Sequence, residues 1–428
     1  MRILFLTQYF PPETGAAQNR LSDLANRLVA AGHDITVLTA LPNYPRGAIF
    51  SGYRGRWIMK EKQGNPKVFR TWVFATKRKA FLPRIVNYLS FSILAFVVGS
   101  LLVKRMDVIF VESPPLFVGL SGFLLSKVLG ARFVLNISDL WPESAVTLGM
   151  LNNRFLIACA THLEEYLYRH ASFVTCQTNG IIDSIRQRCP RTRLALLTNG
   201  VSPEFLTRME SVRLNRESIR RDFNFTEEFI VGYTGVHGLS QGLETILDAA
   251  QRLSRYENIQ FRFWGDGPEK SRLQAITTER NLGNVKLLPT ESASRMAEVL
   301  AAIDVSIVPL KRTELFKGAL PSKLFEAMGA GVPVVVSIEG EARYLIESSA
   351  AGIAIEPENP EQMANAILKL SSDPALRQRL GKNGSNYVAK HHNRGEIAAR
   401  LEQILVEVAA PLPSETRETD ISVHYNRP

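Results

Sequence analysis

The chain has 428 residues, of which 45% are hydrophobic and 21% charged, and its formal net charge is +10. This length and composition exclude a disordered chain and suffice for two domains that each bury a core. Three cysteines, Cys159, Cys176 and Cys189, share no metal-ligand spacing and form no even set, which predicts a reduced, cytosolic compartment. We expect the first residues to form a strand and not a signal peptide, because no charged leader with a cleavage site is present.

The first 40 residues predict a complete strand-helix-strand unit. An apolar strand from Ile3 to Leu6 runs into the loop PPETG, and a second strand, DITVLTA, begins at Asp34. The helix between them is expected to end at Gly32. Such a unit is typical of a doubly wound parallel sheet. Five apolar residues of this helix share one face: Leu21, Leu24, Ala25, Leu28 and Val29.

Between Tyr44 and Arg84 the sequence is basic and aromatic. It holds eleven Lys or Arg and one acid, Glu61. We expect this region to meet anionic lipid headgroups and not nucleic acid, because no helix-turn-helix, zinc-finger or RNP-like pattern accompanies the charge. The residues expected to contact a membrane, or a substrate at its surface, are Arg54, Arg56, Trp57, Lys77, Arg78 and Lys79.

A nearly charge-free run, IVNYLSFSILAFVVGSLLV, follows Arg84 and is long enough to span a membrane. Against a span, the run holds Asn87, three serines and Gly99, and strand-loop alternation resumes directly after it. We therefore expect a helix partly buried in the first domain and partly inserted in the bilayer interface. The protein would then be cytoplasmic and peripheral on the inner face of the cytoplasmic membrane. The alternative is a core helix beside a solvated basic face.

The segment NISDLWPESAV follows the apolar strand ARFVL, so it lies at the carboxyl end of a strand, where parallel sheets bind ligands. Asp139 and Glu143 are candidate catalytic carboxylates, which could deprotonate a hydroxyl or stabilise a developing positive charge; Asp139 is favoured. Trp141 offers a stacking plane to a substrate. Alternatively, Asp139 caps the helix that follows. Glu164 and Glu165 are expected on a solvated helix face.

A polar, charge-rich stretch between Asn199 and Glu228 precedes a second set of short apolar strands: FIVGYTG, IQFRFWG, VKLLP, VSIVPL and VPVVVS. Two sheets are therefore predicted, with the carboxyl ends of their strands at one cleft. The expected division is a first domain over 1–200, a second over 201–390, a helix over about 390–410 that packs back on the first domain, and a disordered tail over 411–428.

The stretch PSKLFEAMGAGVPVVVS predicts a short helix that opens on Pro321 and feeds a buried strand. Lys323 and Glu326 are three residues apart, so they share a face near the positive end of the helix dipole, which favours phosphate. A lysine there can meet diphosphate charge, and a carboxylate can accept hydrogen bonds from both ribose hydroxyls. The alternative is an exposed ion pair on a surface helix, of little consequence.

This segment resembles the signature of the family-4 retaining glycosyltransferases of the GT-B fold. Other pieces follow in the family's order: PPETG resembles its acceptor-side glycine loop, TNGVSPEF its linker entry, and GYTGVHGLSQGLETILDAA and FRFWGDGPEKSRL its first two donor-domain units. The resemblance implies an α/β GT-B fold, with two doubly wound Rossmann-like domains facing across a cleft. Within the family the chain is similar to bacterial capsule and O-antigen transferases of the L-fucosamine (N-acetylfucosaminyl) transferase type.

The resemblance also implies contacts to a nucleotide-sugar donor. They are made by loops at the ends of strands and by the start of the helix that opens on the proline. The implied residues are Gly15, Gly235, His237, Gly238, Gln241, Gly265, Gly267, Leu320, Pro321, Ser322, Lys323 and Glu326.

The chain departs from the family pattern in two respects. Gly318 stands where the family pairs Glu326 with a second glutamate, and His237 and Gln241 stand where it often has the arginine and lysine that hold the diphosphate. No Asp-x-Asp occurs in the chain, so we expect a metal-independent reaction without a cofactor. The groups left to meet phosphate charge are Lys323, Lys317, Arg312 and the backbone amides of Gly238 and residues 318–320.

The expected activity is transfer of a hexosyl or N-acetylhexosaminyl unit, with retention, from a nucleotide sugar, expected to be UDP-linked. The expected acceptor is a polyprenyl-diphosphate-linked saccharide at an anionic membrane surface, in O-antigen, capsule or exopolysaccharide synthesis. A sugar-nucleotide epimerase of the same architecture and a non-catalytic, membrane-docked nucleotide-binding scaffold stay open as alternatives. A nicotinamide-dependent oxidoreductase is disfavoured, because no G-x-G-x-x-G follows a predicted strand and no P-loop occurs.

Overall fold

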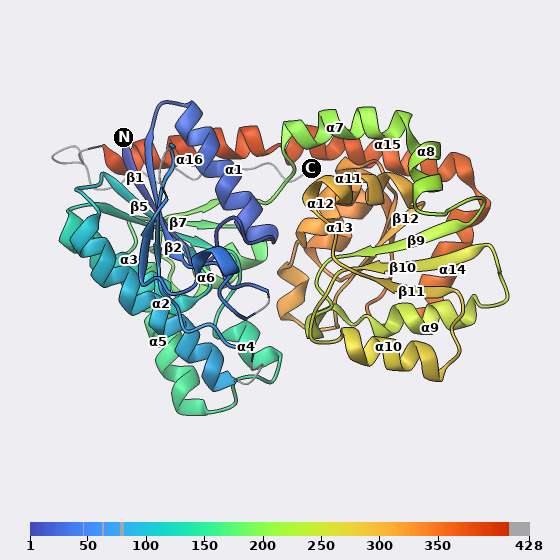
Figure 1. Ribbon diagram of the computed structural model, residues 1–428, viewed down its shortest axis with the longest axis horizontal. Helices are drawn as coiled ribbons and strands as arrows, with labels where there is room; N and C mark the ends of the chain where they lie inside the picture. Colours follow the sequence, from blue (N-terminus) through green and yellow to red (C-terminus); the bar gives the residue numbers. More distant parts are fainter. Residues whose placement is uncertain (46, 62–63, 78–80, 411–428) are drawn as a thin grey trace.

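Two α/β domains lie side by side in the computed structural model, each built on its own sheet (Figure 1). The structure describes residues 1–45, 47–61, 64–77 and 81–410. The predicted α/β GT-B fold class, with two Rossmann-like domains, is confirmed by this arrangement.

The first domain holds an eight-stranded sheet in the order β3-β4-β2-β1-β5-β6-β7-β8. All its neighbours are parallel except β3 and β4, whose antiparallel pairing forms an edge that the sequence did not predict. The strands are β1 (Arg2–Leu6), β2 (Asp34–Ala40), β3 (Ile58–Lys60), β4 (Lys67–Thr71), β5 (Val108–Ser113), β6 (Arg132–Ile137), β7 (Phe173–Cys176) and β8 (Leu194–Leu196).

Helices cover both faces of this sheet, because successive residues of each buried strand point to opposite sides. Ile3 and Phe5 of β1 pack in the cluster that contains α1 and α16, whereas Leu4 and Leu6 pack in the cluster that contains α2 and α3. The helices of this domain are α1 (Ala16–Ala30), α2 (Phe81–Leu102), α3 (Leu116–Leu129), α4 (Glu143–Thr147), α5 (Arg154–His170) and α6 (Asn179–Arg188), with a short 3-10 helix, η1 (Ser51–Tyr53).

The second domain holds a fully parallel six-stranded sheet in the order β11-β10-β9-β12-β13-β14. The strands are β9 (Phe229–Thr234), β10 (Ile259–Trp264), β11 (Val285–Leu288), β12 (Val305–Pro309), β13 (Val334–Ser337) and β14 (Gly352–Ala354). Its helices are α9 (Glu244–Arg252), α10 (Lys270–Glu279), α11 (Ala293–Ala302), α12 (Ser322–Gly329), α13 (Glu341–Ser349), α14 (Pro360–Ser372) and α15 (Pro374–His391), with the 3-10 helices η2 (Leu239–Gln241) and η3 (Leu315–Gly318).

Two chain segments join the domains and run beside each other. The first leads into α7 (Pro203–Leu214) and α8 (Arg216–Asp222), which pack on α11 of the second domain. The second leads into α16 (Arg394–Ala409), which crosses back and packs on α1 (Figure 1). The amide of Val201 donates to the carbonyl of His392 at 3.0 Å, and the amide of Arg394 donates to the carbonyl of Val201 at 2.9 Å.

Helix α2 contains the long apolar run. Among the described residues, α2 is the one helix whose length and composition would allow it to cross a membrane. It connects β4 to β5, which belong to the same sheet, and it packs on α3 with Phe91, Ala95 and Val98 buried. The helix therefore lies along the first domain. We call its exposed apolar side the outer face of α2; it consists of Leu82, Val86, Leu89, Ile93, Val97, Leu101 and Leu102.

Candidate functional site

A cleft of about 3980 Å³ lies between the domains and is lined from both. Asp139 and Glu143 line it from the loop and helix after β6, and Gln241, Leu320 and Pro321 line it from the second domain. These segments follow the carboxyl ends of parallel strands, which is where open α/β sheets bind ligands.

Helix α12 begins at the cleft, directly after Pro321. Pro321 is the N-cap, one residue earlier than the first-turn position the sequence suggested, and Ser322 is the first helical residue. No side chain caps this end, although caps are frequent at helix N-termini, so the positive end of the α12 dipole stays available to an anion.

Lys323, on the first turn of α12, points into the second domain. Its Nζ donates to the Tyr233 hydroxyl at 2.7 Å and to Gln241 Oε1 at 2.7 Å. Burial lowers the pKa of Lys323 to about 7, and the nearby Glu326 carboxylate raises it. An anion placed against this amine would restore the charged form, which makes Lys323 a suitable partner for phosphate.

Glu326 lies one turn further along α12, near Arg394, where the chain crosses back to the first domain. Burial raises the pKa of its carboxyl group, while Arg394 and Lys323 lower it. Arg394 begins α16, and its Nε is buried without a hydrogen-bond partner among the described residues. The sequence offered no signal for Arg394, because only the return of α16 to the first domain brings it near α12.

The glycines after β9 and β10 press two loops together. A Cβ on Gly265 would lie 1.8 Å from the Gly235 carbonyl oxygen, and one on Gly267 would lie 2.5 Å from the His237 carbonyl oxygen. His237 is fully buried there, with both ring nitrogens unpartnered among the described residues. Burial, with Lys270 nearby, lowers its pKa to about 4, so its ring is neutral. These residues shape the loops beneath the cleft and, unlike Gln241, do not line it.

Two further predicted donor residues sit at the starts of helices. Gly238 precedes η2 in the second domain, whereas Gly15 is the N-cap of α1 in the first domain. The loop before Gly15 contains Glu13, which sequence reasoning missed. Its carboxylate accepts hydrogen bonds from the amides of Asn43 and Tyr44, both at 2.7 Å, and burial raises its pKa to about 7. An acid in an apolar loop was the available signal.

Asp139 lies at the mouth of the cleft with its surface open to it. The walls of the cleft nevertheless exclude much of the surrounding water, and this raises the pKa of Asp139 to about 6; hydrogen bonds from Ser144 and the Leu140 amide lower it. The N-cap of α4 is Pro142, and no side chain caps that helix. Asp139 therefore does not cap α4, so the alternative given for it was wrong, although its carboxylate accepts a hydrogen bond from Ser144. Glu143 is exposed.

The expectation for Glu164 was wrong. Its side chain is buried, and its carboxylate accepts hydrogen bonds from Arg188 Nη1 at 2.5 Å and from the Tyr168 hydroxyl at 2.6 Å. The helical pattern did not reveal this, because the arginine comes from α6 and meets α5 only in the folded domain. Glu165 forms an ion pair with Arg169 near the surface, which agrees with the expected solvated helix face.

The basic residues are spread over the first domain. Arg54, Arg56 and Lys77 are exposed, and Trp57 is 66% exposed beside Trp72 at the β3 edge. Trp141 lies apart from them, between β6 and α4, packed on Phe117. Arg78 and Lys79 lie outside the described residues.

The other cations considered for phosphate are engaged with carboxylates. Lys317 Nζ lies 2.7 Å from Glu314 Oε1, and Arg312 Nη2 lies 3.3 Å from Glu356 Oε2. Lys323, by contrast, contacts only neutral groups directly at its Nζ in the hydrogen bonds described above.

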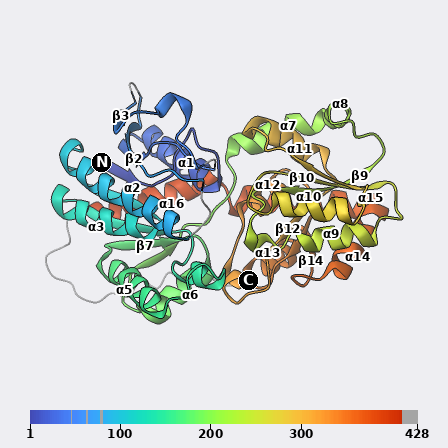
Figure 2. The same ribbon diagram turned by 60° about the horizontal axis from the view of Figure 1, so that its bottom comes forward.

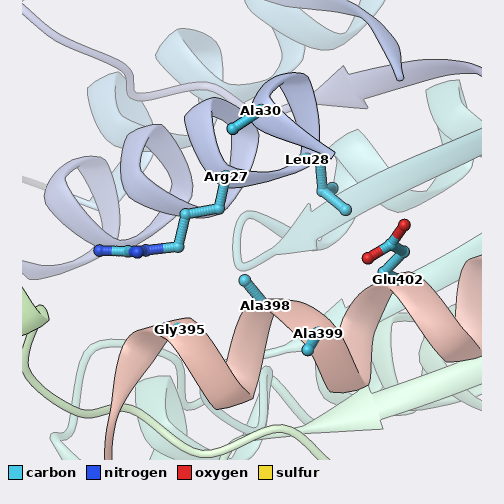
Figure 3. Close-up of a pocket in the computed structure, with 7 residues that line it drawn as sticks. All are labelled: Arg27, Leu28, Ala30, Gly395, Ala398, Ala399 and Glu402. Carbon is cyan, nitrogen blue, oxygen red and sulfur yellow. The ribbon is translucent and has the colours of Figure 1, made fainter. Parts of the chain in front are cut away.

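A second, smaller pocket of about 230 Å³ lies between α1 and α16 (Figure 3). Arg27 and Glu402 border it but point in different directions, and Arg27 is bonded to Asp23 and Glu204. The other residues that line it are alanine, leucine and glycine, so this pocket is a gap between two packed helices.

Two family descriptions match the chain, one in each domain. Residues 15–200 match the glycosyl transferase 4-like domain, and residues 215–387 match glycosyl transferases group 1. The chain is 26% identical over 378 residues to a protein of Escherichia coli K12 provisionally named as the colanic acid biosynthesis glycosyl transferase WcaI, covering 86% of this chain and 91% of that protein. It is 20% identical over 239 residues to the lipopolysaccharide core biosynthesis glycosyltransferase LpsE of Rhizobium meliloti, covering 56% of this chain and 65% of that protein.

Solved structures share the fold. Sucrose-phosphate synthase of Thermosynechococcus elongatus superposes with a TM-score of 0.72 at 19% identity, over 95% of this chain and 98% of the other. The Anabaena protein HepE, in complex with UDP-glucose, superposes with a TM-score of 0.69 at 17% identity, over 95% and 100%. With both domain families matched in order across a two-sheet fold, the chain belongs to the GT-B glycosyltransferases that join a glycosyl transferase 4-like domain to a group 1 domain, those of family 4.

Proposed function

We propose that this glycosyltransferase moves a sugar from a UDP-linked donor to a polyprenyl-diphosphate-linked saccharide at the inner face of the cytoplasmic membrane. The sugar is a hexosyl or N-acetylhexosaminyl unit, with N-acetylfucosamine the first candidate, and its configuration is retained. The product belongs to a cell-surface polysaccharide. The names of WcaI and LpsE and the UDP-glucose bound to HepE support this proposal.

One observation carries the donor half of the proposal: an amine with a pKa near 7 at the open end of α12. In a nucleotide sugar the bond between the anomeric carbon and the diphosphate breaks, and negative charge grows on the leaving diphosphate. We assign the stabilisation of that charge to Lys323 and the amides at the start of α12. To Glu326, further along the same helix, we assign the acceptance of hydrogen bonds from the ribose hydroxyls.

The acceptor half rests on the opposite wall of the cleft. A carboxyl group with a pKa near 6 is largely ionised at neutral pH, yet is basic enough to take a proton. We assign to Asp139 either removal of the acceptor hydroxyl proton or stabilisation of positive charge on the sugar ring. To Trp141, two residues beyond Asp139 in the chain, we assign the stacking plane for the acceptor sugar.

Membrane binding is proposed for the outer face of α2. Its apolar side chains are flanked by exposed cations, Arg84 near its start and Lys104 and Arg105 after its end. A helix lying in the interface with cations at both ends suits an anionic leaflet, where a polyprenyl-linked acceptor resides.

The test is mass spectrometry of the intact protein titrated with UDP-glucose, UDP-N-acetylglucosamine, UDP-N-acetyl-L-fucosamine and GDP-mannose, with EDTA throughout. The sugar that binds is then supplied with anionic vesicles carrying a polyprenyl-diphosphate saccharide, and the product's anomeric configuration is read by NMR. Retained transfer to the lipid supports the proposal. Release of a 2-epimerised sugar without acceptor would establish the epimerase instead, and binding without turnover would establish the scaffold.

A further inference from the structure

The backbones of the two domains touch at a pair of glycines. A Cβ on Gly180, in the first turn of α6, would lie 2.6 Å from Gly318 Cα; one on Gly318, at the end of η3, would lie 3.0 Å from Gly180 Cα. Neither position leaves room for a side chain without a shift of the facing backbone. This contact explains why glycine stands at 318, where the family's second glutamate is expected: α6 occupies the space of the side chain.

A carboxylate fastens the same junction. Glu341 begins α13 of the second domain, and its Oε1 accepts a hydrogen bond from the Gly180 amide of the first domain at 3.2 Å. A carboxylate at the start of α6 also meets the positive end of that helix. Burial raises the pKa of Glu341, against hydrogen bonds from Asn179 and the Gly180 amide, which lower it.

Gly340 holds Glu341 in place. It has φ +75°, and a Cβ there would lie 2.1 Å from the Lys317 carbonyl oxygen, so the start of α13 is pressed against η3. η3 leads through Ala319 and Leu320 into α12, which carries Lys323. One tight junction therefore connects α13, η3 and α12 on the donor side.

On the acceptor side, two sets of contacts connect this junction to the loop that carries Asp139. α6 follows β7, which pairs with β6, and β6 leads directly into that loop. α4, which follows the loop, also lies against η3. Figure 2 shows α6 on the side of the first domain that faces the second.

We infer that Glu341 is a positioning residue for sugar transfer, which holds α6 against η3 and thereby sets the gap between Asp139 and Lys323. The inference rests on the proposed function for its effect on turnover, but not for the contact itself. Glu341 touches no reacting atom in this account. Its substitution should open the cleft and slow transfer, while the nucleotide, whose proposed contacts lie mainly on the second domain, binds nearly as before.

Pulsed electron paramagnetic resonance measures the opening directly. One spin label goes on Cys159, which is exposed while Cys176 and Cys189 are buried, and one on Ser254→Cys, on the exposed loop after α9. In Glu341→Gln the distance distribution should broaden toward longer values. Turnover of the panel sugar that the wild type consumes should fall about tenfold. The dissociation constant for UDP should stay within about twofold.

Matched variants separate the contact from general damage. Glu339→Gln removes a neighbouring acid that lies 3.9 Å from Arg312 and Lys317, and should leave the distribution unchanged. Gly180→Ala should open the cleft as Glu341→Gln does, whereas Gly283→Ala, which has open space around it, should not. Gly180→Ala also decides the matter if Glu341→Gln does not fold.

An unchanged distance distribution in both Glu341→Gln and Gly180→Ala would overturn the inference, as would an opened cleft with wild-type turnover. If the wild type consumes no sugar of the panel, the proposed activity fails, but the distance measurement still decides whether Glu341 holds the domains together.

Discussion

Lys323 Nζ lies 2.7 Å from Gln241 Oε1, so a cation on α12 reaches the loop after β9 where the family often carries a lysine of its own. The Tyr233 hydroxyl completes this arrangement at 2.7 Å. We propose that Lys323 supplies, from α12, the cation for the donor diphosphate that the family often supplies from the loop after β9. With Lys323 in this role, the chain would keep a cation for the donor despite its departures from the family pattern.

The first prediction concerns pH. Because Lys323 has a pKa of about 7 when no anion is bound, it must take up a proton to bind a diphosphate at higher pH. UDP affinity should therefore fall by up to about tenfold per pH unit between pH 7.5 and 9.5. Calorimetry in buffers of different ionisation enthalpy measures both the affinity and the proton uptake. Lys323→Arg, which stays charged in this range, should remove the dependence; a slope equal to wild type in that variant would refute the assignment.

The second prediction concerns Glu326. Removing a charged partner of the ribose hydroxyls should weaken UDP binding by roughly 1.5 to 3 kcal/mol in Glu326→Ala. Binding of uridine should weaken similarly, because the ribose is common to both, whereas binding of pyrophosphate, which has no ribose, should not weaken to the same extent. Calorimetry with the three compounds makes the comparison. Wild-type affinity for uridine in a folded variant would remove Glu326 from the donor site.

The third prediction concerns Asp139. Asp139→Asn keeps the shape of the side chain, and should cut turnover by about 10²-fold or more if the carboxylate acts as a base or stabilises positive charge. UDP affinity should hardly move, because the proposed nucleotide contacts lie mainly on the second domain. Wild-type turnover should rise with pH through about 6, as the carboxyl group ionises. Near-normal turnover at an unchanged melting temperature would contradict the role.

The fourth prediction concerns the membrane. Ile93 and Leu101 of the outer face of α2 are 61% and 76% exposed, and aspartate at both should abolish flotation with anionic vesicles. Leu214→Asp is a matched control, since Leu214 is 89% exposed on α7 of the second domain. Each cation near the surface contributes about 1 kcal/mol, so wild-type recovery should also fall as salt is raised. Equal recovery of the double variant and wild type would place the docking surface elsewhere.

Much of the fold was predictable because its strands are short apolar runs separated by helical patterns. DITVLTA is β2 residue for residue, and FIVGYTG, VSIVPL and VPVVVS contain β9, β12 and β13. The antiparallel β3 was not predictable, because Ile58–Lys60 is three residues long and mostly exposed at a sheet edge. α7 and α8 fell in a stretch whose charge suggested only a change of domain, since their packing surface on α11 is distant in sequence.

The arrangement of the candidate site residues was predictable where one element carries them, as α12 carries Lys323 and Glu326. It was not predictable where partners come from distant segments. Tyr233 lies in the buried strand β9, Arg394 comes from the start of α16, and Glu341 contacts α6 of the other domain. Only the assembled domains bring these groups together, and no local period in the sequence encodes their meeting.

The most direct test of the proposed diphosphate contact returns a lysine to the loop after β9. UDP affinity is measured by calorimetry at pH 6.5, where most of Lys323 is protonated, for the wild type, Lys323→Gln, and the double variant Lys323→Gln with Gln241→Lys. The single variant should lose roughly 1.5 to 3 kcal/mol of binding. The double variant should regain most of it, because the lysine then approaches the same place from the loop after β9. Unchanged affinity in a folded Lys323→Gln variant would contradict the claim that Lys323 holds the donor diphosphate.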